Sequence, residues 1–264
     1  MFKHRAVRAA LVTVSVAAAL TAGGKAVAAA DTAGSCPPPG AAWTTTSRQT
    51  SYQHGEFDLD SNEWNPAGGS DGVPASWMTT WAGYDSSWGI CANESGTGWP
   101  YPEERLFLGQ TRVSSLSGLT SGYAETTPSD GQWDSAYDIW LGQPASAPGQ
   151  SAPEVMIWTA NHGEWTGNPD VVGTVTIAGQ RYQMSVCGKC NRVTFTVPAD
   201  VPAATVHLLA LLQYAARNPA SSAITGKDPV ITEIDRGWEI YKTNGTEPFT
   251  TNRYWVSVRH KLSL

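Results

Sequence analysis

The sequence predicts an all-β fold, in the form of a two-sheet β-sandwich with one packed α-helix. Short runs rich in Val, Ile, Thr, Tyr and Trp alternate with turns rich in Gly, Ser, Asn and Asp, at the spacing of about 8–12 residues that is typical of sandwiches and barrels. The 264 residues include 12 Trp and 26 Gly, and only 15% are charged. This composition excludes coiled coils, helical arrays and disordered chains, which need more charge or fewer aromatic side chains.

Seven segments show the strand pattern most clearly. They are residues 136–141, 154–159, 173–177, 181–186, 192–197, 230–241 and 254–259. The segment 204–218 differs, because its apolar residues follow helical spacing between Pro202 and Pro219. We expect this helix to pack on the outside of a sheet. Residues 142–152 are rich in Pro, Ala, Gly and Ser and are predicted to be a loop within one domain that spans residues 31–264.

Residues 1–30 have the pattern of an export signal. A basic start with Lys3, Arg5 and Arg8 precedes an apolar run over 9–20, and the small residues 28–30 suit a signal peptidase. The apolar run is too short to span about 30 Å of hydrocarbon, so we expect no membrane anchor. The sequence therefore predicts a secreted, extracellular protein.

The charge balance indicates which partners the mature chain suits. Loss of the export signal removes four basic residues and no acids, which lowers the formal net charge from −6 to −10. No basic run follows the N-terminus, so nucleic-acid binding is not expected. An acidic exported protein suits a neutral substrate such as an uncharged polysaccharide. Nothing in the sequence calls for a partner chain, and we expect a monomer.

Four cysteines follow the export signal, and an even number outside the cytosol indicates two disulfides. Cys187 and Cys190 lie between two strand-like runs, so we expect a bridge that closes this turn, which leaves Cys36 to pair with Cys91. A zinc site would need further ligands, and no histidine lies near the turn. We expect no metal and no cofactor.

Carboxylates are the candidates for chemistry, because the sequence has no nucleophile-elbow, zinc-protease or phosphate-loop motif. Alternation along a strand places Glu154, Met156 and Trp158 on one face, and Val155 with Ile157 on the other. The aliphatic face indicates core. The opposite face suits the floor of a sugar-binding cleft, with an ordinary solvated face as the alternative.

Two further predicted strands carry an acid beside an aromatic side chain. Glu239 shares a face with Tyr241, and Asp138 shares a face with Trp140, by the same alternation. Acids on three separate strands predict a concave acidic cleft. Paired carboxylates are the usual machinery for cleaving glycosidic bonds, one as acid and the other as nucleophile or base.

Four motifs that occur in order along the chain resemble those of glycoside hydrolase family 12. They are Asn62-Glu-Trp64, Tyr137-Asp-Ile-Trp140, Glu154-Val-Met-Ile-Trp158 and Gly237-Trp-Glu-Ile-Tyr241. The resemblance covers about residues 52–258 and implies a concanavalin-like β-jelly-roll with a concave substrate cleft. It also implies a secreted endo-β-1,4-glucanase that hydrolyses cellulose-type glucan, mixed-linkage glucan or xyloglucan with retention of configuration.

The same resemblance implies a role for each matching residue. Glu154 becomes the nucleophile, Glu239 the general acid/base, and Asp138 the hydrogen-bond partner of the nucleophile. Sugar contacts are implied for Asn62, Trp64, Trp140, Met156 and Trp158.

The sequence departs from the family pattern in two places. The segment 68–99 is longer than its counterpart and holds extra Trp and Gly. Thr246-Glu-Pro-Phe249 imitates the acid/base motif of some fungal members, which makes Glu247 a rival of Glu239. We prefer Glu239, because Glu247 leaves too few residues before the last strand. A non-catalytic, lectin-like glucan-binding sandwich is the alternative function.

Overall fold

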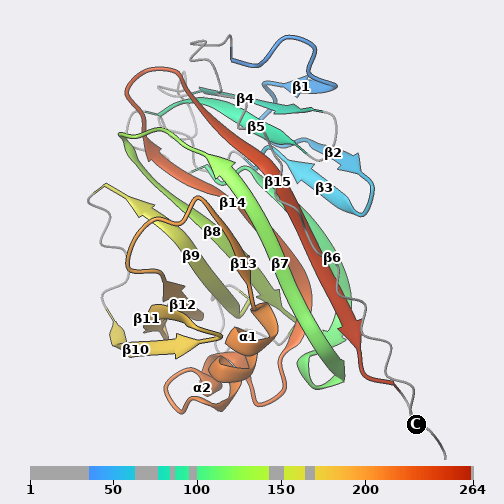
Figure 1. Cartoon of the computed structure of the whole chain (residues 1–264), viewed down its shortest axis with the longest axis vertical. Helices are drawn as coiled ribbons and strands as arrows, with labels where there is room; N and C mark the ends of the chain where they lie inside the picture. The colour runs from blue at the N-terminus through green and yellow to red at the C-terminus, as the bar shows by residue number, and fades with distance from the viewer. Residues whose placement is uncertain are drawn as a thin grey trace, which may run out of the picture. The chain divides into compact units, whose positions relative to one another are not determined.

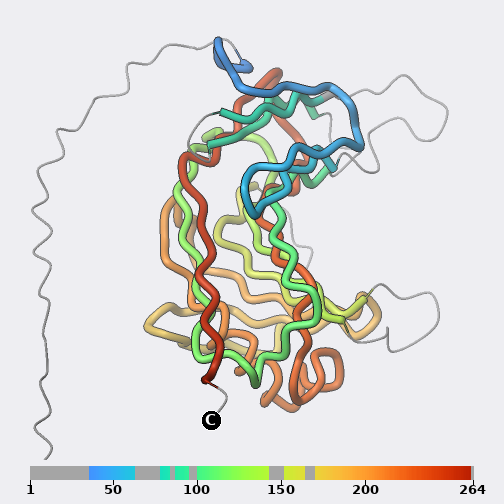
Figure 2. The backbone as a smooth tube through the Cα atoms, turned by 90° about the vertical axis from the view of Figure 1, so that its right-hand side faces the viewer, coloured from blue at the N-terminus to red at the C-terminus, as the bar shows by residue number. Residues whose placement is uncertain are grey.

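The computed structural model describes residues 36–62, 77–83, 87–94, 100–142, 152–163 and 170–262. The predicted export signal and Trp64 lie outside these residues. The predicted all-β sandwich is confirmed, because the described strands form two sheets that pack face to face (Figure 1). Figure 2 shows the two layers, with β7 and β15 on one side and β6, β3 and β2 on the other.

Within the described residues, one sheet has six strands and the other has nine. The six-stranded sheet runs in the order β1 (Trp43–Thr45), β4 (Trp77–Ala82), β5 (Trp88–Asn93), β15 (Glu247–His260), β7 (Leu116–Thr126) and β13 (Ala203–Val206). The nine-stranded sheet runs β10 (Val171–Ile177), β11 (Gln180–Cys187), β12 (Arg192–Thr196), β9 (Glu154–His162), β8 (Gln132–Leu141), β14 (Val230–Lys242), β6 (Glu103–Arg112), β3 (Phe57–Asp60) and β2 (Ser51–His54). The paired strands are antiparallel except β12 and β9, which run parallel.

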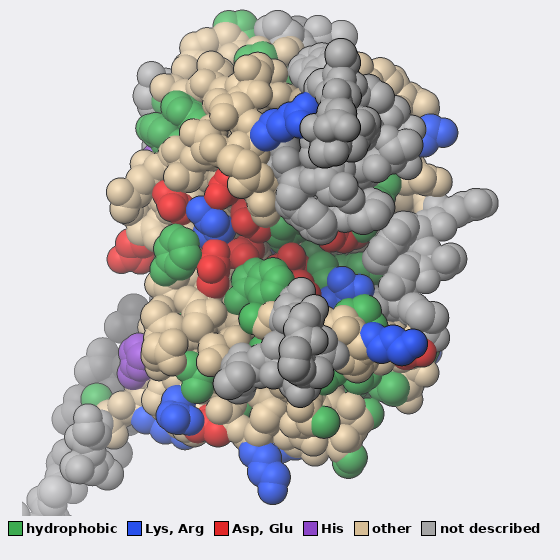
Figure 3. All heavy atoms as spheres, turned by 180° about the vertical axis from the view of Figure 1, so that it is seen from behind, with side chains coloured by type: hydrophobic (Ala, Val, Ile, Leu, Met, Phe, Trp, Pro, Cys, Tyr) green, Lys and Arg blue, Asp and Glu red, His purple; other side chains and the backbone are tan. Residues whose placement is uncertain are grey.

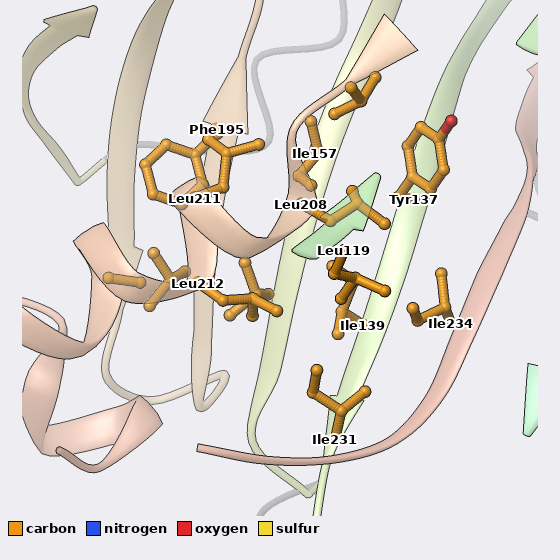
Figure 4. Packing of buried hydrophobic residues seen from close by; sticks show 14 of the residues in the cluster. Leu119, Tyr137, Ile139, Ile157, Phe195, Leu208, Leu211, Leu212, Ile231 and Ile234 are labelled. Carbon is orange, nitrogen blue, oxygen red and sulfur yellow. The ribbon is translucent and has the colours of Figure 1, made fainter. Parts of the chain in front are cut away.

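The predicted alternation of side chains along the strands is confirmed. Val155 and Ile157 of β9 are fully buried and pack with Ile139 of β8 in the main core between the sheets (Figure 4). Leu119 of β7 reaches the same core from the six-stranded sheet. Asp138 of β8 and Glu154 of β9, which alternate with these apolar residues, therefore point to the outer face of the nine-stranded sheet.

The observed helix is shorter than the predicted segment 204–218, and it does not pack on the outside of a sheet as expected. The α-helix α1 covers Leu208–Arg217, whereas residues 203–206 form the edge strand β13, which pairs with β7. Pairing with β7 satisfies backbone groups that a free sheet edge would leave open. Leu208, Leu211 and Leu212 pack into the core beside Ile157 and Phe195, so the helix enters the sandwich instead of covering an outer face (Figure 4).

A short second helix, α2 (Ser222–Thr225), follows α1 and was not predicted. A 3-10 turn over Val113–Ser115 joins β6 to β7. Neither α1 nor α2 has the length and apolar character that a membrane-crossing helix needs, among the parts of the chain that are described.

Both predicted disulfides are present. Cys36 is bonded to Cys91 of β5, and Cys187 is bonded to Cys190 across the turn between β11 and β12. The first bond ties the start of the described chain to the six-stranded sheet. The second closes the turn that precedes β12.

A buried ion pair lies between the two sheets. Arg236 Nη2 is 2.9 Å from Glu125 Oε2, and both side chains are only 3% exposed. The same carboxylate oxygen accepts hydrogen bonds from Ser135 Oγ at 2.7 Å and Trp238 Nε1 at 3.1 Å. The guanidinium also lies 3.9 Å from the ring centroid of Tyr123. This network satisfies the charges that the sandwich encloses.

Glu104 is a second buried acid, and it makes stability depend on pH. It is 3% exposed, and burial raises its pKa to about 8, an effect that the Trp88 indole partly offsets. A glutamate in the unfolded chain has a pKa of about 4.3. The folded state therefore binds more protons between that pH and about 8. Stability is therefore lost progressively as the pH rises through this window.

We expect Glu104→Gln to be more stable than wild type at pH 8 by on the order of 2–4 kcal/mol, and equal to it at pH 4. The amide keeps the shape of the side chain but carries no charge. Thermal unfolding of both proteins at these two pH values measures the difference. An identical pH dependence in the two proteins would contradict the buried neutral carboxyl.

Candidate active site

The predicted acids lie on neighbouring strands of the nine-stranded sheet. In the register of β8 with β9, Trp140 is opposite Glu154, and Asp138 is opposite Met156. On the other side of β8, Asp138 is opposite Asp235 of β14. The face that these residues share is hollowed, and acidic side chains gather around the hollow (Figure 3).

A cavity of about 390 Å³ lies on this face. It is lined by Asn62, Tyr101, Glu103, Arg105, Asp138, Trp140, Glu233, Asp235 and Glu239. Four of the predicted site residues, Asn62, Asp138, Trp140 and Glu239, are therefore brought together. Glu154 is not among these lining residues, but it lies close enough to Asp138 for a hydrogen bond and to Glu239 for the charge of that acid to act on it.

Glu154 is 8% exposed, and burial raises its pKa to about 7. The positive charge of Arg192 lowers this pKa, Glu239 raises it, and a hydrogen bond with Asp138 lowers it. The pKa of Asp138 is itself raised well above its usual range, first by burial and then by the charges of Glu154 and Glu239. Asp138 thus keeps a proton that it can donate to the Glu154 carboxylate.

Glu239 is held by a tyrosine that also contacts a third acid. The hydroxyl oxygen of Tyr241 lies 2.5 Å from Glu239 Oε2 and 3.1 Å from Asp134 Oδ2. The Tyr241 hydroxyl has one proton, so it can donate only one of these two hydrogen bonds. In the other, Tyr241 must accept a hydrogen bond from a protonated carboxyl group. Asp134 is fully buried, which raises its pKa well above the usual range, so this group can donate the hydrogen bond to Tyr241.

The rival acid Glu247 lies in the other sheet. It begins β15, where it is opposite Ala92 of β5, and it interacts with Asp130. It is not among the residues that line the cavity. The structure therefore places Glu239, and not Glu247, beside Asp138.

Met156 and Trp158 lie beneath the cleft surface. They are 1% and 2% exposed and pack with Tyr101 and Ala136 in a small cluster of their own. In this structure they support the floor of the cleft and present little surface to a ligand. Trp140 is more exposed, and its Nε1 donates a hydrogen bond to Asp235 Oδ2 at 2.9 Å.

Two charged residues of β6 that the sequence analysis missed complete the site. Glu103 is 4% exposed and accepts a hydrogen bond from Asn62 Nδ2 at 3.1 Å, and burial raises its pKa well above the usual range. Arg105 lies 2.8 Å from Asp60 and 3.7 Å from Glu233. Alternation over 103–107 could have placed Glu103 and Arg105 on one face, if that segment had been recognised as a strand.

The described residues contain no cluster of His, Cys, Asp and Glu that could hold a metal ion. The site combines several carboxyl groups with Arg105 and Arg192 as nearby cations. A carboxylate with a raised pKa can donate a proton, and an ionised one can attack an electrophilic carbon. The arrangement fits acid/base and nucleophilic chemistry on an uncharged substrate.

The fold and this acidic hollow define a β-jelly-roll sandwich with a carboxylate-lined cleft. Solved structures of family 12 glycoside hydrolases have the same fold. A family 12 xyloglucanase from Bacillus licheniformis is 20% identical with a TM-score of 0.67, and the match covers 82% of this chain and 100% of that one. An endoglucanase from Rhodothermus marinus is 17% identical with a TM-score of 0.68, over 83% and 100%.

A xyloglucanase domain from Sinorhizobium fredii, solved in complex with cellobiose, is 19% identical with a TM-score of 0.64, over 83% of this chain and 99% of that one. No protein-family model and no curated protein matches the sequence. The chain therefore has the fold of the family 12 glycoside hydrolases at low sequence identity.

Proposed function

We propose that this protein is a secreted, retaining endo-β-1,4-glucanase that cleaves internal bonds of a β-glucan. The observation that carries the proposal is the position of Glu154, Asp138 and Glu239 on three adjacent strands, where Asp138 and Glu239 line one cavity and Glu154 interacts with both of them. The fold supports it, because proteins with this fold include xyloglucanases and endoglucanases, and one of them was solved with cellobiose.

In the proposed mechanism, Glu154 attacks the anomeric carbon and forms a covalent glycosyl-enzyme. The bond from that carbon to the glycosidic oxygen breaks, and Glu239 gives its proton to the departing oxygen. Water then attacks the same carbon, Glu239 takes a proton from it, and the Glu154–sugar bond breaks. Asp138 donates a hydrogen bond that holds the Glu154 carboxylate in place.

We assign sugar contacts to the side chains around the cavity. Asn62 and Trp140 line it, and Trp64 follows Asn62 by two residues in the chain. Met156 and Trp158 act from below by fixing the floor. The abundance of carboxylates suits hydroxyl-rich, uncharged sugars, because carboxylates accept hydrogen bonds from hydroxyl groups. The enzyme is proposed to act outside the cell as a monomer.

The test is a reducing-sugar assay of the mature chain on xyloglucan, mixed-linkage glucan and carboxymethyl-cellulose, with Glu154→Gln as the blank. We expect new reducing ends from at least one polymer, and the ranking of rates identifies the substrate. Proton NMR of the first products should show the β-anomer. Saturable binding to the polymers without products would instead indicate a lectin-like glucan-binding protein.

Retention also requires a particular distance between the two reacting carboxyl groups. The two reacting carboxyl groups of a retaining enzyme lie about 5–5.5 Å apart, whereas inverting enzymes need about 6.5–9.5 Å to admit a water molecule. An initial α-anomer would contradict the role of Glu154 as nucleophile.

A further inference from the structure

The turn between β11 and β12 lies beside Glu154, the candidate nucleophile. Cys187 and Cys190 close this turn with a disulfide, and β12 begins two residues later at Arg192. The strand β12 runs parallel to β9, and Arg192 is the register partner of Glu154. The next pair, Val193 and Val155, is fully buried in the core. Arg192 and Glu154 therefore share the cleft face.

Backbone contacts fix the turn to the start of β9. The N–H of Glu154 donates to the carbonyl oxygen of Asn191 at 3.1 Å. Asn191 is fully buried and has a φ of 58°, a left-handed conformation that Asn tolerates better than most residues. The N–H of Cys190 donates to Cys187 Sγ at 3.1 Å. The disulfide-closed turn and the first residue of β9 therefore form one connected unit.

The groups that act on Glu154 come from three strands. Asp138 of β8 and Glu239 of β14 are acids, whereas Arg192 of β12 is a cation. Arg192 Nε is buried and has no hydrogen-bond partner among the described residues. The Arg192 side chain as a whole is half-buried. A guanidinium beside a buried carboxyl group favours the ionised form of that group. Burial of Glu154 has the opposite effect.

We propose that Arg192, held by the disulfide-closed turn, is a positioning residue that keeps the Glu154 carboxylate ionised and oriented for attack. This inference rests on the proposed function, because it assigns the means by which the same nucleophile is kept reactive in a buried, acid-rich cleft. The positive charge of the guanidinium performs this role. The disulfide contributes by fixing the position of Arg192.

The first test compares wild type with Arg192→Gln and Arg192→Lys. Removing the positive charge raises the pKa of Glu154, so the acid limb of the kcat/KM profile should move up by about one pH unit or more in Arg192→Gln. At a pH below that limb this shift corresponds to about a tenfold loss or more. Arg192→Lys should recover most of the shift. Identical acid limbs in wild type and Arg192→Gln would overturn the inference.

The second test separates the turn from general stability. We expect Cys187→Ser/Cys190→Ser to move the acid limb in the same direction as Arg192→Gln. The matched control is Cys36→Ser/Cys91→Ser, whose disulfide lies in the six-stranded sheet and whose loss should lower the melting temperature without moving the limb. Equal shifts in both double variants, or none in the first, would overturn the role of the turn.

A measurement without turnover distinguishes this inference from the proposed function. Carbon-13 NMR of selectively labelled glutamate follows the ionisation of Glu154 directly, with Glu154→Gln used to assign its signal. We expect the titration midpoint to rise in Arg192→Gln even if no glucan proves to be a substrate. A protein that hydrolyses glucan but shows the same midpoint in both forms would refute the role of Arg192 alone.

Discussion

Glu154→Gln is expected to lose glucan hydrolysis by at least about 10³-fold, with a melting temperature close to that of wild type. The amide has nearly the same shape as the carboxyl group, so it fits the buried position between Asp138 and Arg192. An amide cannot form the glycosyl-enzyme, and the remaining groups supply acid catalysis alone. Initial rates on the best polymer, with thermal unfolding of the same samples, measure both expectations.

Substrates with good leaving groups separate the two carboxyl roles. An aryl glycoside whose phenol departs without protonation should still react with Glu239→Gln to form the glycosyl-enzyme, because the lost group served as the acid. The same substrate should fail with Glu154→Gln. Glu247→Gln is the control, because Glu247 lies in the other sheet and should behave as wild type. Loss of turnover in Glu247→Gln, with a normal Glu239→Gln, would contradict the assignment.

Arg236→Met should lower the free energy of unfolding by about 3–5 kcal/mol, because it leaves the Glu125 carboxylate buried without its counter-charge. Arg236 and Glu125 are each 3% exposed, so water cannot replace the lost partner. Methionine fills part of the volume but cannot donate to the carboxylate or stack its charge on Tyr123. Chemical denaturation at neutral pH measures the loss.

Two further variants test whether the buried charge is the cause. Glu125→Gln in the Arg236→Met background removes the unpaired charge, so it should recover a large part of the stability. Arg112→Met removes an exposed arginine, 62% accessible and 3.5 Å from Asp228, and should cost no more than about 1 kcal/mol. Equal losses in Arg236→Met and Arg112→Met would show that burial of the pair does not matter.

The sequence alone predicted the sandwich, the two disulfides and the side of β8, β9 and β14 that faces the core. These features depend on short-range patterns. Alternation fixes which side of a strand is apolar, as Val155 and Ile157 show. The spacing of Cys187 and Cys190 fits a hairpin turn. The acids of β8, β9 and β14 were found for the same reason, since each stands out against an otherwise apolar strand.

Local pattern was misleading where a long-range contact decides the structure. The apolar residues over 204–206 fit a helix as well as a strand, and the free edge of β7 selects the strand. The buried position of Arg236 gives no sequence signal, because its charge is compensated by Glu125, a residue 111 positions away. Sequence spacing cannot show such a pairing.

The sequence by itself determined which residues could form the core, which cysteines could pair and which three acids could do chemistry. Only the tertiary structure decided what surrounds those acids. Glu103, Asp134 and Arg192 come close to these acids from β6, β8 and β12 because the order of strands in the sheet is not their order in the chain. The proton that each carboxyl keeps or loses depends on burial and on neighbouring charges, and these exist only once the sheets have packed.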